Sequence, residues 1–240
     1  MKKVIVNSIS FEKAKELLLK KDFKKKQVFN FFNSNDMFFM KTNRLFREGV
    51  NKNKNFNFID GNMVSRISKG KRLRGPEFTR KFFEDKDLLK NSNHFFIGFE
   101  EKDLDSLAKN FKDIERKNLF SYNPPYIKGT FIFPKKEREK IIKLINKKNT
   151  DYVWIGVGSP KQTILANQIA KQLKTRYIFT VGAAMDFLLE KKEEAPSWIQ
   201  KIGLEWLFRL ITDFKHTRKK VWQSFIGTFW AIGKVSKKEF

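Results

Sequence analysis

The chain contains no cysteine, and only two of its 240 residues are histidine, His94 and His216. Disulfide bonds and thiolate metal sites are therefore excluded, and a reducing compartment is compatible with this composition. Catalytic triads that need a histidine base, and zinc sites built from several imidazoles, are disfavoured for the same reason. Any catalytic base must then come from another residue type, most simply a carboxylate.

Long apolar runs are absent as well. No segment reaches the ~20 apolar residues that a transmembrane helix requires. The basic start at residues 1–6 has only three apolar residues before Asn7, so we expect no secretory signal peptide. We therefore expect a cytoplasmic protein, with peripheral attachment to the inner face of the cell membrane decided by its surface charges.

Acidic residues are scarce: 26 Asp and Glu stand against 51 Lys and Arg, which gives a net charge of +25. An anionic partner would account for this excess, whether nucleic acid, an acidic membrane surface or a phosphorylated substrate. The alternative is compositional, because lysine, asparagine and phenylalanine are all abundant, as in chains encoded by AT-rich DNA. The placement of the charges must decide between these explanations.

What is present is an alternation of apolar segments typical of buried strands with segments of helical periodicity. The expected strands are residues 27–32, 56–59, 94–99, 151–155 and 177–181. The expected helices include residues 11–20, 37–48, 62–68, 104–114 and 137–147. This alternation predicts an α/β fold, a Rossmann-like parallel sheet with helices on both faces.

The C-terminal part differs in pattern, so we divide the chain into an α/β core (residues 1–194) and a helical appendage (residues 195–240) in which we expect no strand. Apolar residues recur there at helical spacing through residues 221–230. Basic residues beside exposed aromatic residues are typical of a helix in a membrane interface. Docking on another subunit, with self-association, and packing on its own domain are the alternatives.

Two expected strands end in glycine turns that precede a helix, GVGSP at residues 156–160 and GAA at residues 182–184. Ligands of open α/β sheets bind outside the carboxyl ends of the strands, so these turns predict a nucleotide-type ligand. The first turn is neither a dinucleotide fingerprint nor a P-loop, but its backbone N–H groups can hold a phosphate. Gly156, Gly158 and Gly182 are therefore candidate binding residues.

Three aspartates stand where expected strands end: Asp36, Asp60 and Asp186. Asp60 follows an apolar run and precedes a glycine, which favours a side chain directed at the ligand site. The alternative is a helix N-cap, the commonest role of an Asp before a helix. Asp186 has the same alternative, and its ligands would be ribose hydroxyls or a base edge. Gln162 is either a ligand contact or an ordinary surface residue.

Several motifs, taken together, carry a resemblance to a known protein family. They are Gly158-x-Pro160-Lys161-Gln162, Gly182-x-x-x-Asp186-Phe187, Ala195-Pro196-x-Trp198 and Leu204-Glu205-Trp206-x-x-Arg209-Leu210. In order and spacing they resemble the WecG/TagA/CpsF family of bacterial glycosyltransferases. The N-terminal half adds Asn33-x-Asn35, Asp60-Gly61 and Arg72-Leu73-x-Gly75-x-Glu77. The similarity extends over residues 4–222.

The resemblance implies an inverting transfer of N-acetylmannosamine or a related hexose from a UDP-sugar to a polyprenyl-diphosphate-linked sugar, in the synthesis of a cell-surface polysaccharide or teichoic acid-type polymer. It assigns the general base to Asp60 and substrate contacts to Asn35, Arg72, Gln162 and Asp186. Asn33 stands where the family usually has threonine and is included among the substrate contacts.

The resemblance also assigns the appendage to the acceptor and to an anionic membrane surface. The residues concerned are Arg209, Lys215, Arg218, Lys219, Lys220 and Trp222. Lysines replace arginines of the family at positions 219 and 220, and a lysine lacks the bidentate fork of arginine. The appendage is therefore expected to bind anions more as a set of point charges.

No metal and no cofactor besides the donor is expected, because the expected ligand loops contain no Asp-x-Asp motif. Arginines and backbone N–H groups can neutralise the departing diphosphate. Two other classes stay open as alternatives: a basic nucleic-acid-binding protein and a non-catalytic scaffold of the same fold. The carboxylates in the loops would repel phosphates, so no specific nucleic-acid partner is expected.

Overall fold

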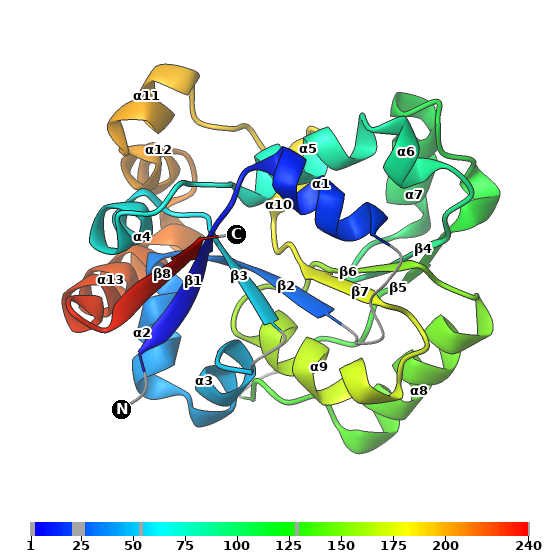
Figure 1. The fold of residues 1–240 in the computed structure, drawn as a ribbon, viewed down its shortest axis with the longest axis horizontal. Helices are drawn as coiled ribbons and strands as arrows, with labels where there is room; N and C mark the ends of the chain where they lie inside the picture. The colour runs from blue at the N-terminus through cyan, green and yellow to red at the C-terminus, as the bar shows by residue number, and fades with distance from the viewer. Residues whose placement is uncertain (1–2, 21–26, 53–54, 128–129, 240) are drawn as a thin grey trace.

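A single eight-stranded sheet forms the centre of the computed structural model, which describes residues 3–20, 27–52, 55–127 and 130–239 (Figure 1). The strand order is β5-β4-β6-β7-β2-β3-β1-β8, and all strand pairs are parallel. The strands are β1 (Val4–Ser8), β2 (Gln27–Phe32), β3 (Asn55–Ile59), β4 (His94–Ile97), β5 (Leu119–Tyr122), β6 (Tyr152–Ile155), β7 (Tyr177–Thr180) and β8 (Val235–Glu239). The predicted α/β class is confirmed.

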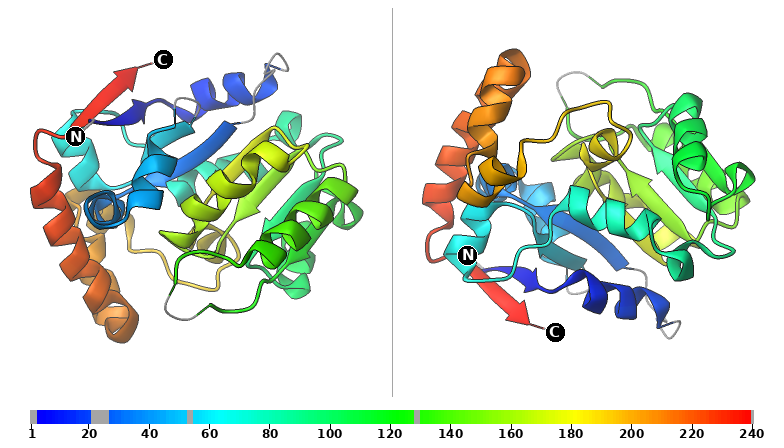
Figure 2. Two further views of the ribbon diagram at one scale, coloured as in Figure 1. Left: turned by 90° about the horizontal axis from the view of Figure 1, so that it is seen from below. Right: turned by 90° about the horizontal axis from the view of Figure 1, so that it is seen from above.

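Helices cover both faces of this sheet, as predicted (Figure 2). One face carries α1 (Phe11–Leu19), α5 (Gly75–Phe83), α6 (Lys86–Leu89), α7 (Glu101–Asn110) and α10 (Ala184–Leu188). The other carries α2 (Ser34–Thr42), α3 (Arg44–Val50), α4 (Asn62–Ser68), α8 (Lys135–Lys147), α9 (Lys161–Ile169) and α13 (Phe214–Ala231). The short helices α11 (Ser197–Ile202) and α12 (Glu205–Thr212) precede α13.

Side-chain alternation gives the two faces of the sheet different chemistry, because successive residues of a strand point to opposite sides. On one face, aromatic residues stack across the strands and against α5; the ring centroids of Trp154 and Phe179 are 4.5 Å apart. Phe82 of α5 meets Trp154 edge-on at 4.8 Å. On the other face, aliphatic residues such as Val153 and Ile178 pack against α8 and α9. These cores hold the strand ends, and the loops that leave them, in fixed positions.

The expected helix over residues 37–48 is in fact two helices, α2 and α3, separated at Asn43. The side chain of Asn43 accepts a hydrogen bond from the backbone N–H of Phe46 at 2.9 Å, so this residue ends one helix and caps the next. The composition of the segment is helical throughout. The break therefore depends on a single capping residue, which helical periodicity does not reveal.

The expectation that residues 195–240 hold no strand is wrong, because β8 pairs in parallel with β1 at the edge of the sheet. Val4 lies opposite Val235 in this pairing. The sequence of β8, VSKKE, lacks apolar alternation because it is an exposed edge strand, and lysines are common on such edges. The last residues of the appendage are thus part of the central sheet, close to the N-terminal strand (Figure 2).

His94 is fully buried at the start of β4, and both of its ring nitrogens are hydrogen-bonded. Its Nδ1 accepts from the indole N–H of Trp154 at 3.1 Å, and its Nε2 lies 2.7 Å from the hydroxyl of Ser92. Burial lowers the pKa of His94 to about 3, so the folded protein holds a neutral imidazole. Unfolding exposes the ring, and the unfolded chain then binds the proton.

Acid is therefore expected to destabilise the fold through His94. The pKa is depressed in the folded state, so stability is lost as pH falls below about 6.5, by at most about 1.4 kcal/mol per pH unit. Urea unfolding at several pH values between 8 and 4 measures this slope. The His94→Leu variant should show a shallower slope with a lower stability at pH 8. An unchanged slope would assign the acid sensitivity to other groups.

Candidate active site

The loops that follow β2, β3, β6 and β7 meet at the carboxyl edge of the sheet, where these four strands are neighbours. Direct contacts join them. The hydroxyl of Ser159, after β6, donates to the carboxylate of Asp36, after β2. The backbone N–H of Asp60, after β3, donates to the carbonyl of Phe32 at 3.0 Å. The sequence prediction that ligand loops converge at one sheet edge is thus supported by contacts between them.

Asp60 is held in a fixed orientation by the first residue of α5. Its Oδ1 accepts the backbone N–H of Gly75 at 2.8 Å, so the carboxylate binds the start of α5 rather than capping α4, whose N-cap is Gly61. Within the described part of the chain, Oδ2 of Asp60 has no hydrogen-bond partner. The side chain is partly exposed. One oxygen is thus anchored and the other is available to a ligand, the arrangement that a general base requires.

Asn33 and Asn35 lie at the start of α2 beside this aspartate. Asn33 caps the helix, because its side-chain oxygen accepts the backbone N–H groups of Asn35 and Asp36. Its Cα and Cβ lie 3.3 Å from the position that a Cβ on Gly61 would take. Asn35 contributes a buried Oδ1 with no hydrogen-bond partner among the described residues. A buried acceptor of this kind is costly unless a ligand donates to it.

Gln162 provides a second unpaired acceptor on the β6–β7 side. Its side-chain N–H donates to the carbonyl of Thr180 at 3.0 Å, which leaves Oε1 buried and without a partner among the described residues. A Cβ on Gly182 would lie 3.4 Å from this oxygen. Gln162 is therefore a buried residue of the loop cluster, 7% exposed, rather than the surface residue that was its alternative interpretation.

The three glycines of the expected turns lie in this cluster, and two have a specific structural requirement. Gly158 has φ of +82° and Gly182 has φ of +55°, both in the left-handed region that favours glycine. Gly156 makes a close approach: a Cβ there would lie 2.4 Å from the ring of Phe99 and 3.4 Å from the carbonyl oxygen of Gly182. The first of these turns leads into the N-terminal end of α9, and the N-terminal end of a helix is suited to a phosphate.

Asp186 lies on α10, at the same edge as Asp60. The two are linked through Gly75, whose backbone N–H binds Asp60. A Cβ added to Gly75 would lie 3.5 Å from the Cβ of Ala184 on α10. The carboxylate of Asp186 does not cap its helix; it pairs with Lys192 at 2.7 Å and is 26% exposed. A ribose hydroxyl would therefore compete with, or join, a lysine ammonium at this carboxylate.

Arg72 is engaged by the protein itself. Its guanidinium donates to the carbonyl of Asp60 at 2.6 Å, to Asn62 at 2.8 Å and to both carboxylate oxygens of Glu205 on α12. Beside it, Arg74 donates to Gln200 of α11. These polar contacts hold α11 and α12 against the loop between α4 and α5. The sequence pattern does not indicate these partners of the arginines, because Gln200 and Glu205 lie 126 and 133 residues away along the chain.

The basic and aromatic residues predicted for the appendage lie on its surface. Trp222 is 69% exposed, and Lys215, Arg218, Lys219 and Lys220 are exposed along the first turns of α13. The side chain of Arg209 lies outside the described residues. The opposite side of α13 packs on α2 through Gly227. Packing on its own domain is thus observed for one side of α13, and the other side carries the exposed aromatic residues.

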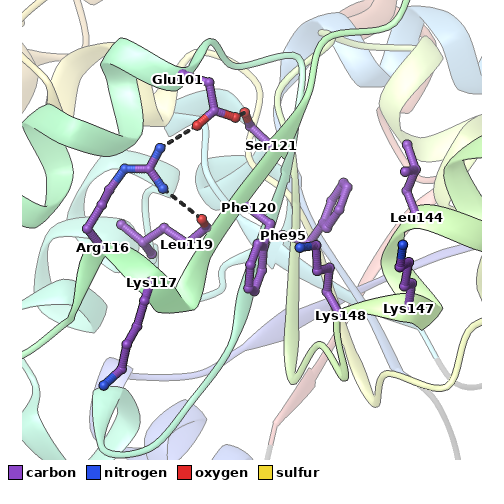
Figure 3. Close-up of a pocket in the computed structure, with 10 residues that line it drawn as sticks. All are labelled: Phe95, Glu101, Arg116, Lys117, Leu119, Phe120, Ser121, Leu144, Lys147 and Lys148. Carbon is purple, nitrogen blue, oxygen red and sulfur yellow. Dashed lines mark hydrogen bonds and ion pairs between the residues drawn. The ribbon is translucent and has the colours of Figure 1, made fainter.

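A separate hollow of about 390 Å³ lies at the opposite end of the sheet, beside β5 (Figure 3). Its lining includes Arg116, which binds Glu101 and the carbonyl of Leu119, and Lys148, whose ammonium lies 4.5 Å from the ring centroid of Phe120. None of the predicted site residues lines this hollow. It is therefore distinct from the carboxyl-edge loop cluster.

Two properties of the described residues concern metal binding and membrane insertion. Among residues 3–20, 27–52, 55–127 and 130–239, no group of three or more His, Asp or Glu side chains is arranged to hold a metal ion. In the same part of the chain, no helix has the length and apolar character needed to cross a bilayer.

The fold is an open parallel α/β sheet whose carboxyl-edge loops carry a carboxylate and two buried amide oxygens that have no partner among the described residues. This is the arrangement of an α/β protein that binds a ligand at the ends of its strands. The family model of the Glycosyl transferase WecG/TagA/CpsF family matches residues 2–239. The chain belongs to this family. The resemblance stated from the motifs is confirmed.

Individual relatives match over a shorter stretch. Proteins of Staphylococcus aureus strains MRSA252 and NCTC 8325 / PS 47, both named N-acetylglucosaminyldiphosphoundecaprenol N-acetyl-beta-D-mannosaminyltransferase, are 29% identical to the chain over 79 residues. Each match covers 33% of this chain and 31% of the relative. The chain thus spans about a third of the length of the relatives that it matches.

Proposed function

We propose that this protein is an inverting glycosyltransferase that moves N-acetylmannosamine or a related hexose from a UDP-sugar to a polyprenyl-diphosphate-linked sugar. The observation that carries the proposal is the location of Asp60, Asn35 and Gln162 in loops at the carboxyl edge of one sheet, with the buried oxygens of Asn35 and Gln162 unpaired among the described residues. Family membership and the names of the relatives support the acceptor class. The product would enter a cell-surface polymer of the polysaccharide or teichoic acid type.

The proposed chemistry is a single displacement. Asp60 accepts the proton of the acceptor hydroxyl through Oδ2, while the N–H of Gly75 holds Oδ1. The acceptor oxygen bonds to the anomeric carbon as the bond from that carbon to the UDP oxygen breaks, so UDP leaves with the electron pair. Attack from the face opposite the leaving group inverts the configuration.

The donor side of the site would consist of the glycine turns, Gln162 and Asp186. Backbone N–H groups at the start of α9 suit the diphosphate, and the positive end of this helix favours its charge. The hydroxyls of a sugar or ribose can donate to the free Oε1 of Gln162 and to the carboxylate of Asp186. These groups need no metal ion to bind UDP, so we propose a metal-independent mechanism.

A screen of nucleotides and UDP-sugars tests the proposal. UDP is expected to raise the melting temperature of the protein, because a ligand of the native state stabilises it by mass action. With Asp186→Ala, about tenfold more UDP should be needed to reach the same rise in melting temperature, because the variant loses about one charge-assisted hydrogen bond. EDTA should change neither binding nor transfer. Loss of activity that Mg²⁺ or Mn²⁺ restores would contradict the metal-independent mechanism, and stabilisation by no UDP compound would contradict the function.

We also propose that α11–α13 dock on an anionic membrane surface, which would bring the site to a lipid-linked acceptor. Trp198, Trp222 and Phe229 are 63, 69 and 74% exposed, and the exposed basic residues Arg218 and Lys219 of α13 lie about one turn before Trp222. Apolar rings at the headgroup level and basic residues attracted by anionic lipids are the two components of interfacial binding.

Point substitutions test this docking better than deletion of residues 215–240, which would also remove β8 from the sheet. Trp222→Ala combined with Phe229→Ala should reduce partitioning onto vesicles of anionic phospholipid about tenfold or more, in a sedimentation assay. Tyr126→Ala is the control, since this aromatic residue is 86% exposed but lies outside the appendage. Equal partitioning of all variants, or concentration-dependent self-association lost in the double variant, would favour subunit docking instead.

A further inference from the structure

Asp36 joins two loops of the site through one carboxylate. It lies in the first turn of α2 and is 4% exposed. Its Oδ2 accepts the backbone N–H of Asn33 at 3.0 Å, which completes the cap of α2. Its Oδ1 accepts the hydroxyl of Ser159, which belongs to the loop between β6 and α9. The residue therefore connects the loop that holds Asn33 and Asn35 to the glycine turn on the proposed donor side.

Within the described part of the chain no lysine or arginine pairs with Asp36, so no cation there compensates its charge. Lys161, at the start of α9, binds the carbonyl of Ile127 instead, and Lys215, Arg218 and Lys219 of the packed helix α13 are exposed on its first turns. The charged group that acts on Asp36 is another carboxylate, Asp60. Burying a carboxylate without a cation is costly, and an asparagine could cap α2 without that cost.

We propose that Asp36 is a positioning residue of the transfer reaction: through Ser159 it fixes the glycine turn of the proposed donor side against the start of α2. This inference rests on the proposed function, since it concerns the same site. Asp36 is not among the residues of the motifs that carry the family resemblance, which include its neighbours Asn33 and Asn35.

The strength of this link depends on the charge of Asp36. Burial and the charge of Asp60 raise the pKa of Asp36 to about 7. Asp36 therefore changes its charge near neutral pH. Its bond to Ser159 is a charge-assisted hydrogen bond when it is ionised and an ordinary one when it is protonated.

Kinetics of two variants at about pH 8, where Asp36 is mostly ionised, test this link. Ser159→Ala removes the link between the loops but keeps the charge, so the KM for the donor should rise about fivefold with kcat nearly unchanged. Asp36→Asn keeps an oxygen that can cap α2 but weakens the bond to Ser159, so it should also raise the KM for the donor about twofold to fivefold, with kcat nearly unchanged.

Asp103→Asn is the matched control. Asp103 occupies the same capping position in α7, with its Oδ2 accepting the N–H of Glu100 at 3.0 Å, and it is 3% exposed, but it pairs with Lys191 away from Asp60. Its variant should lose stability without raising the KM for the donor. If Asp36→Asn behaves as this control does, and Ser159→Ala leaves the donor KM unchanged, then Asp36 only caps α2.

A titration without substrates keeps the inference separable from the proposed function. The carboxyl ¹³C resonance of Asp36 should titrate near pH 7 in the wild type and at higher pH in Ser159→Ala, because the hydroxyl of Ser159 stabilises the ionised carboxylate. An unchanged midpoint overturns the link between Asp36 and Ser159, whatever the reaction. Absence of sugar transfer by the wild type, with the link present, would instead contradict the proposed function.

Discussion

Replacing Asp60 by asparagine is expected to lower the transfer rate by about 10²–10⁴-fold, the usual contribution of a general base, while UDP binding changes little. The physical reason is local. Asparagine keeps an oxygen that can accept the N–H of Gly75, so the start of α5 stays in place. It provides no second basic oxygen at the position of Oδ2, so the acceptor hydroxyl keeps its proton. Radiolabelled sugar transfer and UDP binding by calorimetry measure the two quantities.

Asp151→Asn provides the control for this substitution. Its carboxylate accepts the backbone N–H of Asn93 at 2.9 Å, much as Asp60 accepts that of Gly75, but it precedes β6 and so lies at the opposite edge of the sheet. This variant should transfer sugar at nearly the wild-type rate. A fully active Asp60→Asn variant would remove Asp60 from the mechanism. Loss of UDP binding together with transfer would indicate that Asp60 organises the site rather than acting as the base.

The centre of the sheet could be predicted from the sequence because its strands are buried on both faces. Such strands read as continuous apolar runs, as in residues 152–155, and each is followed by a turn residue that marks the carboxyl end. The positions of Asp60, Gln162 and Asp186 follow from this reading, since parallel strands place their carboxyl ends at one edge. The local pattern therefore identified which loops meet, and the contacts between them agree with it.

The pairings between distant segments could not be predicted in this way. Glu205 binds Arg72 across 133 residues, and neither residue type nor local spacing indicates which carboxylate a given arginine will meet. The strand β8 carries lysines on an exposed edge, so its sequence resembles a polar tail. Asp36 looks like an ordinary helix-capping residue in the sequence. Its link to Ser159 depends on the sheet order, which brings the loops after β2 and β6 together.

The packing of α13 on α2 is a second contact between the appendage and the site, besides the bonds of Glu205 and Gln200 to Arg72 and Arg74. Gly227 of α13 lies directly on the backbone of α2: a Cβ at this glycine would be 2.5 Å from the nitrogen of Phe38 and 2.6 Å from the carbonyl oxygen of Ser34. Backbone atoms cannot move aside as a flexible side chain can, so any larger residue must push the two helices apart. The start of α2 carries Asn33, Asn35 and Asp36. A shift of this helix would therefore displace groups of the site.

Gly227→Val is accordingly expected to destabilise the protein by about 3 kcal/mol or more, and to lower transfer further than the loss of folded protein explains. Chemical unfolding measures the first effect, and activity per folded molecule the second. Phe229→Ala, two residues along the same helix, is the matched control because its side chain is 74% exposed and should change stability by less than about 0.5 kcal/mol. If Gly227→Val retains wild-type stability, α13 can leave α2 at little cost. The helix α13 would then be an element whose position does not affect the geometry of the site. If stability falls while activity per folded molecule is unchanged, the contact supports the fold alone, and the position of α2 does not depend on it.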